Sequence, residues 1–378
     1  MSPSIHTGIA CNLDSNIITA ALPLLEQEHV EAIEWSFDAL FNWNEVPAWF
    51  RDLLQVFADA GRLTGHGIFF SIFSARWSAK QDLWLEQLRQ LNRELPFDHV
   101  SEHFGFMSGR DFHHGAPLSV PLTASTLAIG RDRLLRIQDA CQCPVGLENL
   151  AFAFSLEEVR QHGAFLEQLL EPVNGFIILD LHNLYCQMKN FDLGFDALVH
   201  SYPLHRVREI HISGGSWEPS TIIPTRNIRR DTHDDAVPEE VFEMLAQTIA
   251  LCPALKFIFL EQLGAGLHTV SQQSQFRSDY LRICEIVKKH APAVAQGDAE
   301  SFSPRPNLQP PSAHIQDAVL YEEQRRLSRI LETASDCQDA RQKLESSILK
   351  NSAWQTEAWP DYMLETALRI AQKWKDGF

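Results

Sequence analysis

Polar side chains that can bind metal or move protons follow apolar runs at several places in this sequence. In GFIILDLHNLY the run from Phe176 to Leu179 ends at Asp180, and His182 and Asn183 follow at once. A strand that reaches the protein surface can end in this way. A strand that carries polar groups to a site can end in the same way. The ends of the other apolar runs distinguish these two possibilities.

Five further apolar runs also carry a histidine or a glutamate near their ends. These residues are His66 in TGHGI, His103 in VSEHF, Glu148 in VGLEN, His211 in EIHIS and Glu261 in FIFLE. A loop after the seventh run adds Asp231 and His233, in RDTHDD. Their spacing of two places both side chains on one face if the segment is extended. Together with Asp180 and Asn183, these residues form a candidate site.

Metal ions explain why so many such groups would gather. Carboxylates buried together repel one another and lose their hydration, and cations relieve that cost. A donor set of histidine, carboxylate and carboxamide without cysteine suits iron, manganese or zinc. The donors outnumber the needs of one ion, so two or three ions are expected. We therefore predict that Asp180 and Asn183 end their strand because they bind metal.

Three other histidines near the candidate site are weaker candidates. Neighbouring residues in a strand point to opposite faces, so His182 is expected to support a ligand or to pack rather than to bind metal. His113 and His114, in RDFHHGAP, follow the fourth run and lie over the same end of the fold. They could face a substrate, although an exposed loop position is favoured.

The elements that would position these residues alternate regularly. Short apolar runs occupy 6–11, 30–37, 63–72, 99–104, 144–150, 175–181, 207–213 and 257–263. Segments with helical periodicity lie between them, for example 46–60, 82–95, 155–170 (with Ser155 as N-cap) and 237–251. This alternation predicts an α/β fold, a (β/α)8 TIM barrel, whose active sites lie at the carboxyl ends of the strands. An open doubly wound sheet is the alternative, because alternation alone does not show closure.

The composition changes after the predicted barrel, which occupies residues 1–291. Residues 292–313 are rich in proline, serine and alanine and are expected to be a linker. Residues 314–378 resume helical periodicity but are too few for a large core. We expect a small helical appendage that docks on the barrel or binds a peptide or a partner protein.

The overall composition excludes several classes of function. The formal net charge of −17 over 378 residues argues against nucleic acid as a partner and allows a basic peptide. No apolar run reaches the roughly 20 residues that span a bilayer, and no signal peptide is visible. Seven scattered cysteines suit a reducing compartment. We therefore expect a cytoplasmic protein without membrane or nucleic-acid partners.

The candidate site also carries a family resemblance. The chain resembles the multinuclear non-haem iron-dependent oxidative enzymes, formerly a domain family of unknown function, which have a barrel related to xylose isomerase and endonuclease IV. The matching stretches, within residues 5–290, are TGHGI, VSEHF, PLSVPLTASTL, VGLEN, LDLHNLY, EIHISGG, DTHDDAV and FLEQ. The resemblance implies iron at the strand ends, dioxygen as co-substrate and a cysteine-bearing, ribosomally made peptide as substrate. It also implies that a partner protein often captures the leader of the precursor.

By position in these motifs, the resemblance carries over nine metal ligands. They are His66, His103, Glu148, Asp180, Asn183, His211, Asp231, His233 and Glu261. Two departures concern the surroundings of the metal. His182 replaces the first asparagine of the family pattern LDxNN, and Gly214 and Gly215 stand where a histidine commonly follows EIH.

We therefore expect an enzyme that uses two to three iron ions (mixed Fe2+/Fe3+) and O2 to modify peptidyl cysteine oxidatively. The residues expected to be catalytic are Asp180, His233 and Glu148. One alternative is an endonuclease IV-like phosphodiester hydrolase, which the net charge disfavours. Another is a sugar isomerase-like enzyme, which would not need so many ligands. A metal-binding scaffold without catalytic activity is the third.

Overall fold

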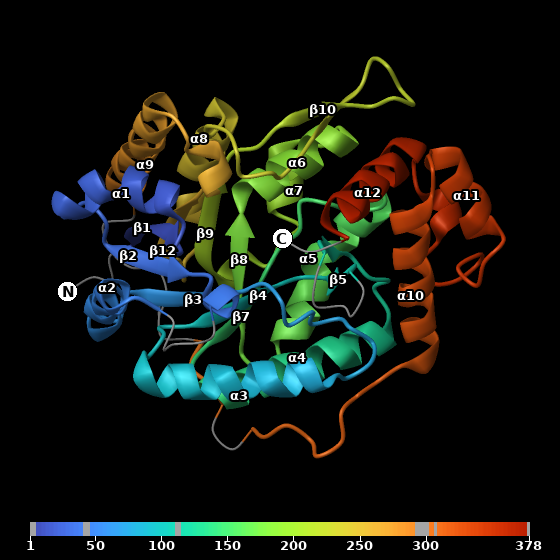
Figure 1. Cartoon of the computed structure of the whole chain (residues 1–378), viewed down its shortest axis with the longest axis horizontal. Helices are drawn as coiled ribbons and strands as arrows, with labels where there is room; N and C mark the ends of the chain where they lie inside the picture. Colours follow the sequence, from blue (N-terminus) through green and yellow to red (C-terminus); the bar gives the residue numbers. More distant parts are fainter. Residues whose placement is uncertain (1–4, 41–45, 110–114, 292–301, 306–307, 376–378) are drawn as a thin grey trace.

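A closed barrel of eight parallel strands forms the centre of the molecule (Figure 1). The computed structural model describes residues 5–40, 46–109, 115–291, 302–305 and 308–375. The barrel strands are β1 (His6–Cys11), β2 (Ala32–Trp35), β3 (Leu63–Gly67), β4 (Val100–His103), β7 (Val145–Glu148), β8 (Phe176–Asp180), β9 (Val207–Ser213) and β12 (Phe257–Glu261). Their order is β1-β12-β9-β8-β7-β4-β3-β2, and β1 pairs with both β12 and β2. This closure confirms the TIM barrel and excludes the open sheet.

Helices surround the strands, as the apolar periodicity predicted (Figure 1). The helices of the barrel are α1 (Ser15–Glu26), α2 (Ala48–Asp59), α3 (Ala79–Glu94), α4 (Ala124–Cys141), α5 (Leu156–Leu170), α6 (Leu181–Phe191), α7 (Phe195–Val199), α8 (Glu239–Thr248) and α9 (Val270–His290). Short 3-10 turns are η1 (Phe37–Leu40), η3 (Leu204–Arg206), η4 (Ile249–Leu251) and η5 (Gly264–Gly266). Within the described ranges, no helix is long and apolar enough to cross a bilayer.

Two small antiparallel ribbons lie in the loops that leave the barrel strands. One pairs β5 (Phe106–Met107) with β6 (Pro117–Leu118) after β4. The other pairs β10 (Trp217–Pro219) with β11 (Asn227–Arg229) after β9. Loops that follow the strands form the carboxyl-terminal face of a TIM barrel, which we call the mouth. The two ribbons therefore belong to the same face as the candidate site.

Each predicted apolar run contains one barrel strand, but some strands are shorter than their runs. The run 63–72 gives a strand that stops at Gly67, because the next two backbone N–H groups, of Ile68 and Phe69, donate to the Asp38 carboxylate. The run 175–181 gives β8, and α6 begins directly after Asp180. His182 therefore lies in a helix, and the strand-alternation argument applied to it was wrong.

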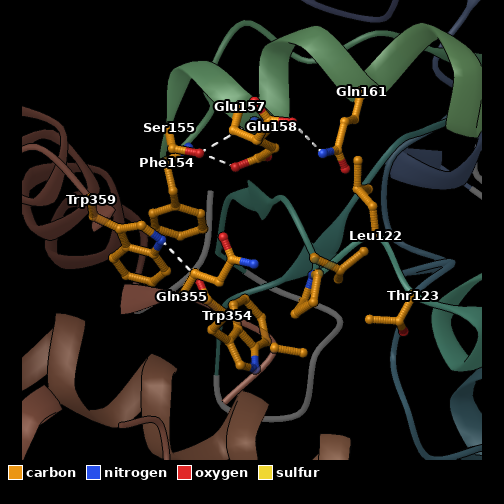
Figure 2. Close-up of a pocket in the computed structure, with 13 residues that line it drawn as sticks. Leu122, Thr123, Phe154, Ser155, Glu157, Glu158, Gln161, Trp354, Gln355 and Trp359 are labelled. Atoms are coloured by element: carbon orange, nitrogen blue, oxygen red, sulfur yellow. Dashed lines mark hydrogen bonds between the residues drawn. The ribbon is translucent and has the colours of Figure 1, made fainter. Parts of the chain in front are cut away.

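The carboxyl-terminal helical appendage packs against the barrel beside α4 and α5 (Figure 1). It contains α10 (Ala318–Thr333), α11 (Cys337–Glu345), η6 (Thr356–Ala358) and α12 (Asp361–Trp374). The Gln324 amide donates to the Phe73 carbonyl at 2.8 Å and accepts from the Ala75 N–H at 3.0 Å. Trp359 stacks on Phe154 with ring centroids 3.8 Å apart (Figure 2).

The apolar residues of the appendage belong to the same continuous core as those of the barrel. The linker predicted at 292–313 is described only at 302–305 and 308–313. Within it, the carbonyls of Pro311 and Ala313 accept from Arg136 of α4. The boundaries 1–291, 292–313 and 314–378 remain predictions.

Candidate metal centre

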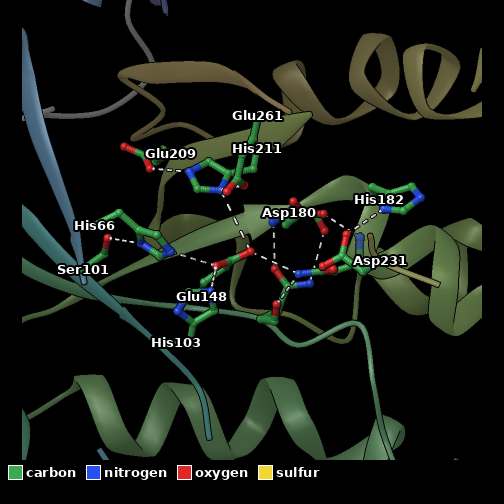
Figure 3. Close-up of polar contacts among 12 residues, drawn as sticks. His66, Ser101, His103, Glu148, Asp180, His182, Glu209, His211, Asp231 and Glu261 are labelled. Carbon is green, nitrogen blue, oxygen red and sulfur yellow. Dashed lines mark hydrogen bonds and ion pairs between the residues drawn. The ribbon is translucent and has the colours of Figure 1, made fainter. Parts of the chain in front are cut away.

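Three strands bring the first group of donors together at the mouth (Figure 3). β4 and β7 pair in register so that His103 lies opposite Glu148, and His66 comes from the neighbouring strand β3. His66 Nε2 lies 3.3 Å and His103 Nε2 3.4 Å from the same carboxylate oxygen, Glu148 Oε2. One donor atom from each residue lies within 4.8 Å of the others, so the three can share one ion.

The second and third groups continue from the first along the mouth. Glu148, Asp180 and His211 form the second group, because β8 and β9 place Asp180 opposite His211. Asp180, His233 and Glu261 form the third, with His233 Nδ1 3.4 Å from Glu261 Oε1. Glu148 belongs to the first two groups and Asp180 to the last two. The site is therefore a row of three groups joined by shared carboxylates.

The remaining two predicted ligands lie beside this row. Asn183 donates from Nδ2 to Glu148 Oε1 at 3.1 Å, and its N–H donates to Asp180 Oδ1. Asp231 Oδ1 lies 2.7 Å from His233 Nε2. The segment 231–233 is not extended as assumed, because His233 has a φ of +52°. The two side chains meet all the same, and such a conformation in a residue other than glycine is typical of functional sites.

Several donor atoms in this site make no hydrogen bond although they are buried. They are His66 Nε2, Asp180 Oδ2, Asn183 Oδ1 and His211 Nδ1, of which the two histidine nitrogens each lie 3.3 Å from a carboxylate oxygen without hydrogen-bond geometry. A buried polar atom without a partner costs about 1–3 kcal/mol, and native proteins contain few of them. Four at one place, all on predicted ligands, are accounted for if metal ions are their partners. The residues present therefore fit a multinuclear metal centre.

Hydrogen bonds on the far side of three histidine rings decide which nitrogen faces the site. His66 Nδ1 lies 2.8 Å from Ser101 Oγ, whose hydroxyl donates onward to the Gly65 carbonyl. His103 Nδ1 lies 3.2 Å from the Gly67 carbonyl, which can only accept. In each ring, Nδ1–H therefore donates to this acceptor and Nε2 faces Glu148. This tautomer is the one a metal ligand needs.

His211 is held by two carboxylates from inside the barrel. Its Nε2 lies 2.8 Å from Glu209 Oε1 and 3.2 Å from Glu34 Oε2. Both oxygens accept, so Nδ1 is left facing Glu148 and Glu261. Glu34 and Glu209 are not among the residues predicted from the sequence. The signal that could have found them is a glutamate inside an otherwise apolar strand, in AIEW and VREIHIS.

The charges of the site depend strongly on one another. Burial raises the pKa of Asp180 well above its usual range, and the charges of Asp231 and Glu148 raise it further. Burial opposes a charge on His66, yet Glu148 and Glu34 raise its pKa to about 9. Burial also opposes a charge on Glu261, but His233 and His211 hold its pKa well below the usual range. Without metal, the site thus holds protons that an ion would displace.

His182 supports Asp231 rather than entering the row of donors. Arg229 Nε donates to His182 Nε2 at 3.0 Å, so the proton of His182 lies on Nδ1, which is 3.0 Å from Asp231 Oδ1. The Asn190 side chain holds the Arg229 backbone, because its Oδ1 accepts the Arg229 N–H and its Nδ2 donates to the Arg229 carbonyl. The rings of Tyr185 and Trp217 flank the Arg229 guanidinium. His113 and His114 lie outside the described residues.

Comparison with known proteins agrees with this geometry. Residues 21–262, well over half of the chain, match the family described as RiPP precursor modification enzyme MbnB/TglH/ChrH. The chain belongs to this family. RiPPs are ribosomally synthesised and post-translationally modified peptides, so family membership makes the chain an enzyme that modifies a precursor peptide.

Relatives and a solved structure extend the comparison. A UPF0276 protein of Chromobacterium violaceum is 29% identical over 200 residues, 52% of this chain and 68% of the relative. A UPF0276 protein of Shewanella loihica is 24% identical over 227 residues, 59% of this chain and 78% of the relative. The crystal structure of an IOLI protein with a binding zinc atom covers 76% of this chain and 99% of its own, at 12% identity and a TM-score of 0.52. This likeness confirms that the chain has a barrel fold.

Proposed function

We propose that this protein is a multinuclear iron enzyme that uses dioxygen to oxidise cysteine residues of a ribosomally synthesised precursor peptide. The observation that carries the proposal is the row of three donor groups joined by Glu148 and Asp180. A single ion would need neither shared carboxylate. Two or three neighbouring ions can hold a substrate atom and an oxidant side by side.

The residues that would hold the ions follow from the groups. His66 and His103 would hold the first ion, His211 the second, and His233 with Glu261 the third, while Glu148 and Asp180 would each serve two of these positions. Asp231, which contacts His233, would complete the third position, and Asn183, which contacts Glu148 and Asp180, would complete the second. When bound, iron supplies an open position for a thiolate and one-electron chemistry with dioxygen, for which mixed Fe2+/Fe3+ states are suited.

The protein itself fixes the orientation of the Asp180 and His233 side chains. Asp180 caps α6 by accepting the Asn183 N–H on Oδ1, which fixes the carboxylate with Oδ2 toward the site. His233 Nε2 lies 2.7 Å from Asp231 Oδ1 and Nδ1 lies 3.4 Å from Glu261 Oε1, so these two carboxylates fix the orientation of the ring. We propose Asp180, His233 and Glu148 as the catalytic residues.

The proposed substrate and setting follow from the family and from charge. A net charge of −17 favours a basic peptide over DNA or RNA and disfavours a phosphodiester hydrolase of the endonuclease IV type. All seven cysteines of the chain are free thiols, which suits a cytoplasmic location. A partner protein that captures the leader of the precursor is part of the proposal.

The test combines dioxygen, iron and a cysteine peptide. Full-length protein loaded with iron is incubated with a cysteine-containing precursor peptide, with and without air, and the products are analysed by mass spectrometry. We expect dioxygen uptake and a mass change only when peptide and air are both present. A peptide with serine for the target cysteine should be inert, because a serine hydroxyl stays protonated near neutral pH. Complete modification without air, or cleavage of abasic-site DNA, would contradict the proposal.

A further inference from the structure

A cavity of about 180 Å³ lies where the appendage meets the barrel (Figure 2). Two of its walls come from the barrel, namely the loop 120–123 before α4 and the segment 154–161 at the start of α5. The third wall is the appendage segment 353–359. The barrel walls follow β4 and β7, the strands that carry His103 and Glu148. The cavity therefore lies on the same face as the candidate metal centre.

Aromatic rings form much of the cavity surface. Phe154 and Trp359 stack, and the Trp354 ring stands at 83° to Phe154 with centroids 6.4 Å apart. The Trp354 indole N–H donates to Glu323 Oε2, and the Trp359 indole N–H donates to the Trp354 carbonyl. Both indole donors are thus used within the protein. Trp354 and Trp359 therefore contribute ring surfaces to the cavity and no hydrogen-bond donors.

The polar part of the cavity is acidic. Glu157 and Glu158 are among its 13 lining residues, and none of those 13 is lysine, arginine or histidine. Glu158 Oε2 accepts the Phe154 N–H at 2.9 Å, and burial raises the pKa of this carboxyl to about 7. Glu157 accepts from the Gln161 amide. Two acids beside aromatic rings, with no lining cation, leave a place for a positive charge from outside the chain.

We propose that this cavity binds the side chain of a lysine or arginine residue of the precursor peptide. The inference rests on the proposed function, because it takes a peptide as the substrate. The alkyl stem of such a side chain packs on Val120 and Leu122, while its cationic end meets the Trp354 ring and Glu158. The net charge of −17 attracts a basic peptide to the protein.

The chain limits how far the cavity lies from the metal centre. Glu148 and Phe154 are six positions apart, so their Cα atoms are separated by at most about 22 Å. An extended peptide covers the same span with about six residues. If the peptide is extended, a basic residue held in the cavity therefore lies about six positions or fewer from the cysteine that reaches the metal centre.

Fluorine NMR on the full-length protein labelled with fluorotryptophan tests the site directly. The resonances are assigned with Trp354→Phe and Trp359→Phe. The probes are acetylated and amidated tripeptides, glycine–X–glycine, in which X is arginine, lysine, norleucine or glutamate. We expect the arginine and lysine peptides to shift both resonances, and the norleucine peptide to require about tenfold higher concentration because it lacks the charge. The glutamate peptide should have no effect.

Substitutions separate the charge from the fold. Glu158→Gln keeps an oxygen that accepts the Phe154 N–H and should weaken arginine-peptide binding at least about fivefold, with norleucine binding unchanged. Glu243 is exposed on the surface of α8, so Glu243→Gln is the matched control and should bind like the wild type. Equal binding of arginine and norleucine, unchanged binding by the Glu158 variant, or no shift with any peptide would overturn the inference. The measurement needs no iron or dioxygen, so its failure differs from failure of the proposed function.

Discussion

Three histidines of the candidate centre share one arrangement at the residue scale. His66, His103 and His211 each have one ring nitrogen facing an acceptor and the other facing the shared carboxylates. The acceptors come from Ser101, a backbone carbonyl and a pair of glutamates, so the chemistry is the same while the partners differ. Ligand orientation is thus built into the strands before any ion binds.

The shared carboxylates give a prediction about metal content. Glu148→Ala should lose about two ions per chain, because Glu148 belongs to two donor groups, whereas His103→Ala should lose about one. Both variants are purified from iron-supplemented cells and measured by elemental analysis, with exposed Glu243→Ala as control. Equal losses from the two variants would mean that Glu148 does not lie between ions.

His182 gives a second prediction at this scale, because the family pattern has asparagine there. His182→Asn should keep its iron but lower the free energy of unfolding by about 1–3 kcal/mol, since the buried Arg229 Nε loses its acceptor. In the double variant with Arg229→Met, the further cost of His182→Asn should be smaller. Urea unfolding measures the cost, and loss of iron from the single variant would show that His182 holds metal.

The sequence predicts the ligand types better than their contacts. All nine predicted ligands lie at the mouth, because each stands near a strand end, in the first turn of α6 or in a loop that follows a strand. The contact of Glu34 with His211 could not be predicted from the position of either residue in its strand. It depends on how two strands that are not neighbours face each other across the barrel interior. The role of His182 also depended on the start of α6, which the apolar pattern does not mark.

At the element scale, periodicity found the strands but not the small ribbons. Each barrel strand has four to seven residues and lies within one of the predicted apolar runs. The ribbons β5–β6 and β10–β11 have two or three residues per strand, too few for a period to appear. Their pairing depends on the loops that carry them across the mouth. The position of the appendage likewise required tertiary contacts that no local pattern contains.

One buried glutamine tests how firmly the appendage is attached. Gln324 is fully buried and bonds two backbone groups of the barrel, so Gln324→Ala should cost about 2–3 kcal/mol of unfolding free energy. Arg325→Ala, exposed on the same helix, should cost less than about 0.5 kcal/mol. Iron content should not change, because no predicted ligand lies in the appendage. Equal costs in urea unfolding would show that this contact does not secure the appendage.

At the scale of the whole molecule, a series of ionisable groups in contact runs through the barrel. It leads from the amino-terminal ends of the strands, which we call the floor, to the mouth. Lys256 and Arg208 contact Asp98, which contacts His99 Nδ1 at 3.0 Å. His99 Nε2 lies 2.8 Å from Glu209, and Glu209 lies against His211. Basic and acidic groups alternate along this path, which reduces the cost of burying each one. The floor and the metal centre are therefore parts of one electrostatic network.

Asp98 offers the cleanest test of this network, because it lies at the end away from the metal centre. Burial opposes its ionisation, but His99, Arg208 and Lys256 hold its pKa well below the usual range. Asp98→Asn should therefore lower the free energy of unfolding at pH 7 by about 3–5 kcal/mol, since Arg208 and Lys256 lose their counter-ion.

The sign of the pH dependence follows from that lowered pKa. The stabilisation by Asp98 is present above its unfolded pKa of about 4 and is lost as the pH falls. The difference between wild type and Asp98→Asn should thus be constant from pH 7 to 5 and shrink by up to about 1.4 kcal/mol per unit below pH 4. Urea unfolding across this range measures it, with exposed Asp52→Asn as control. A difference that stays constant down to pH 3 would show that the floor carboxylate is not ionised in the folded protein.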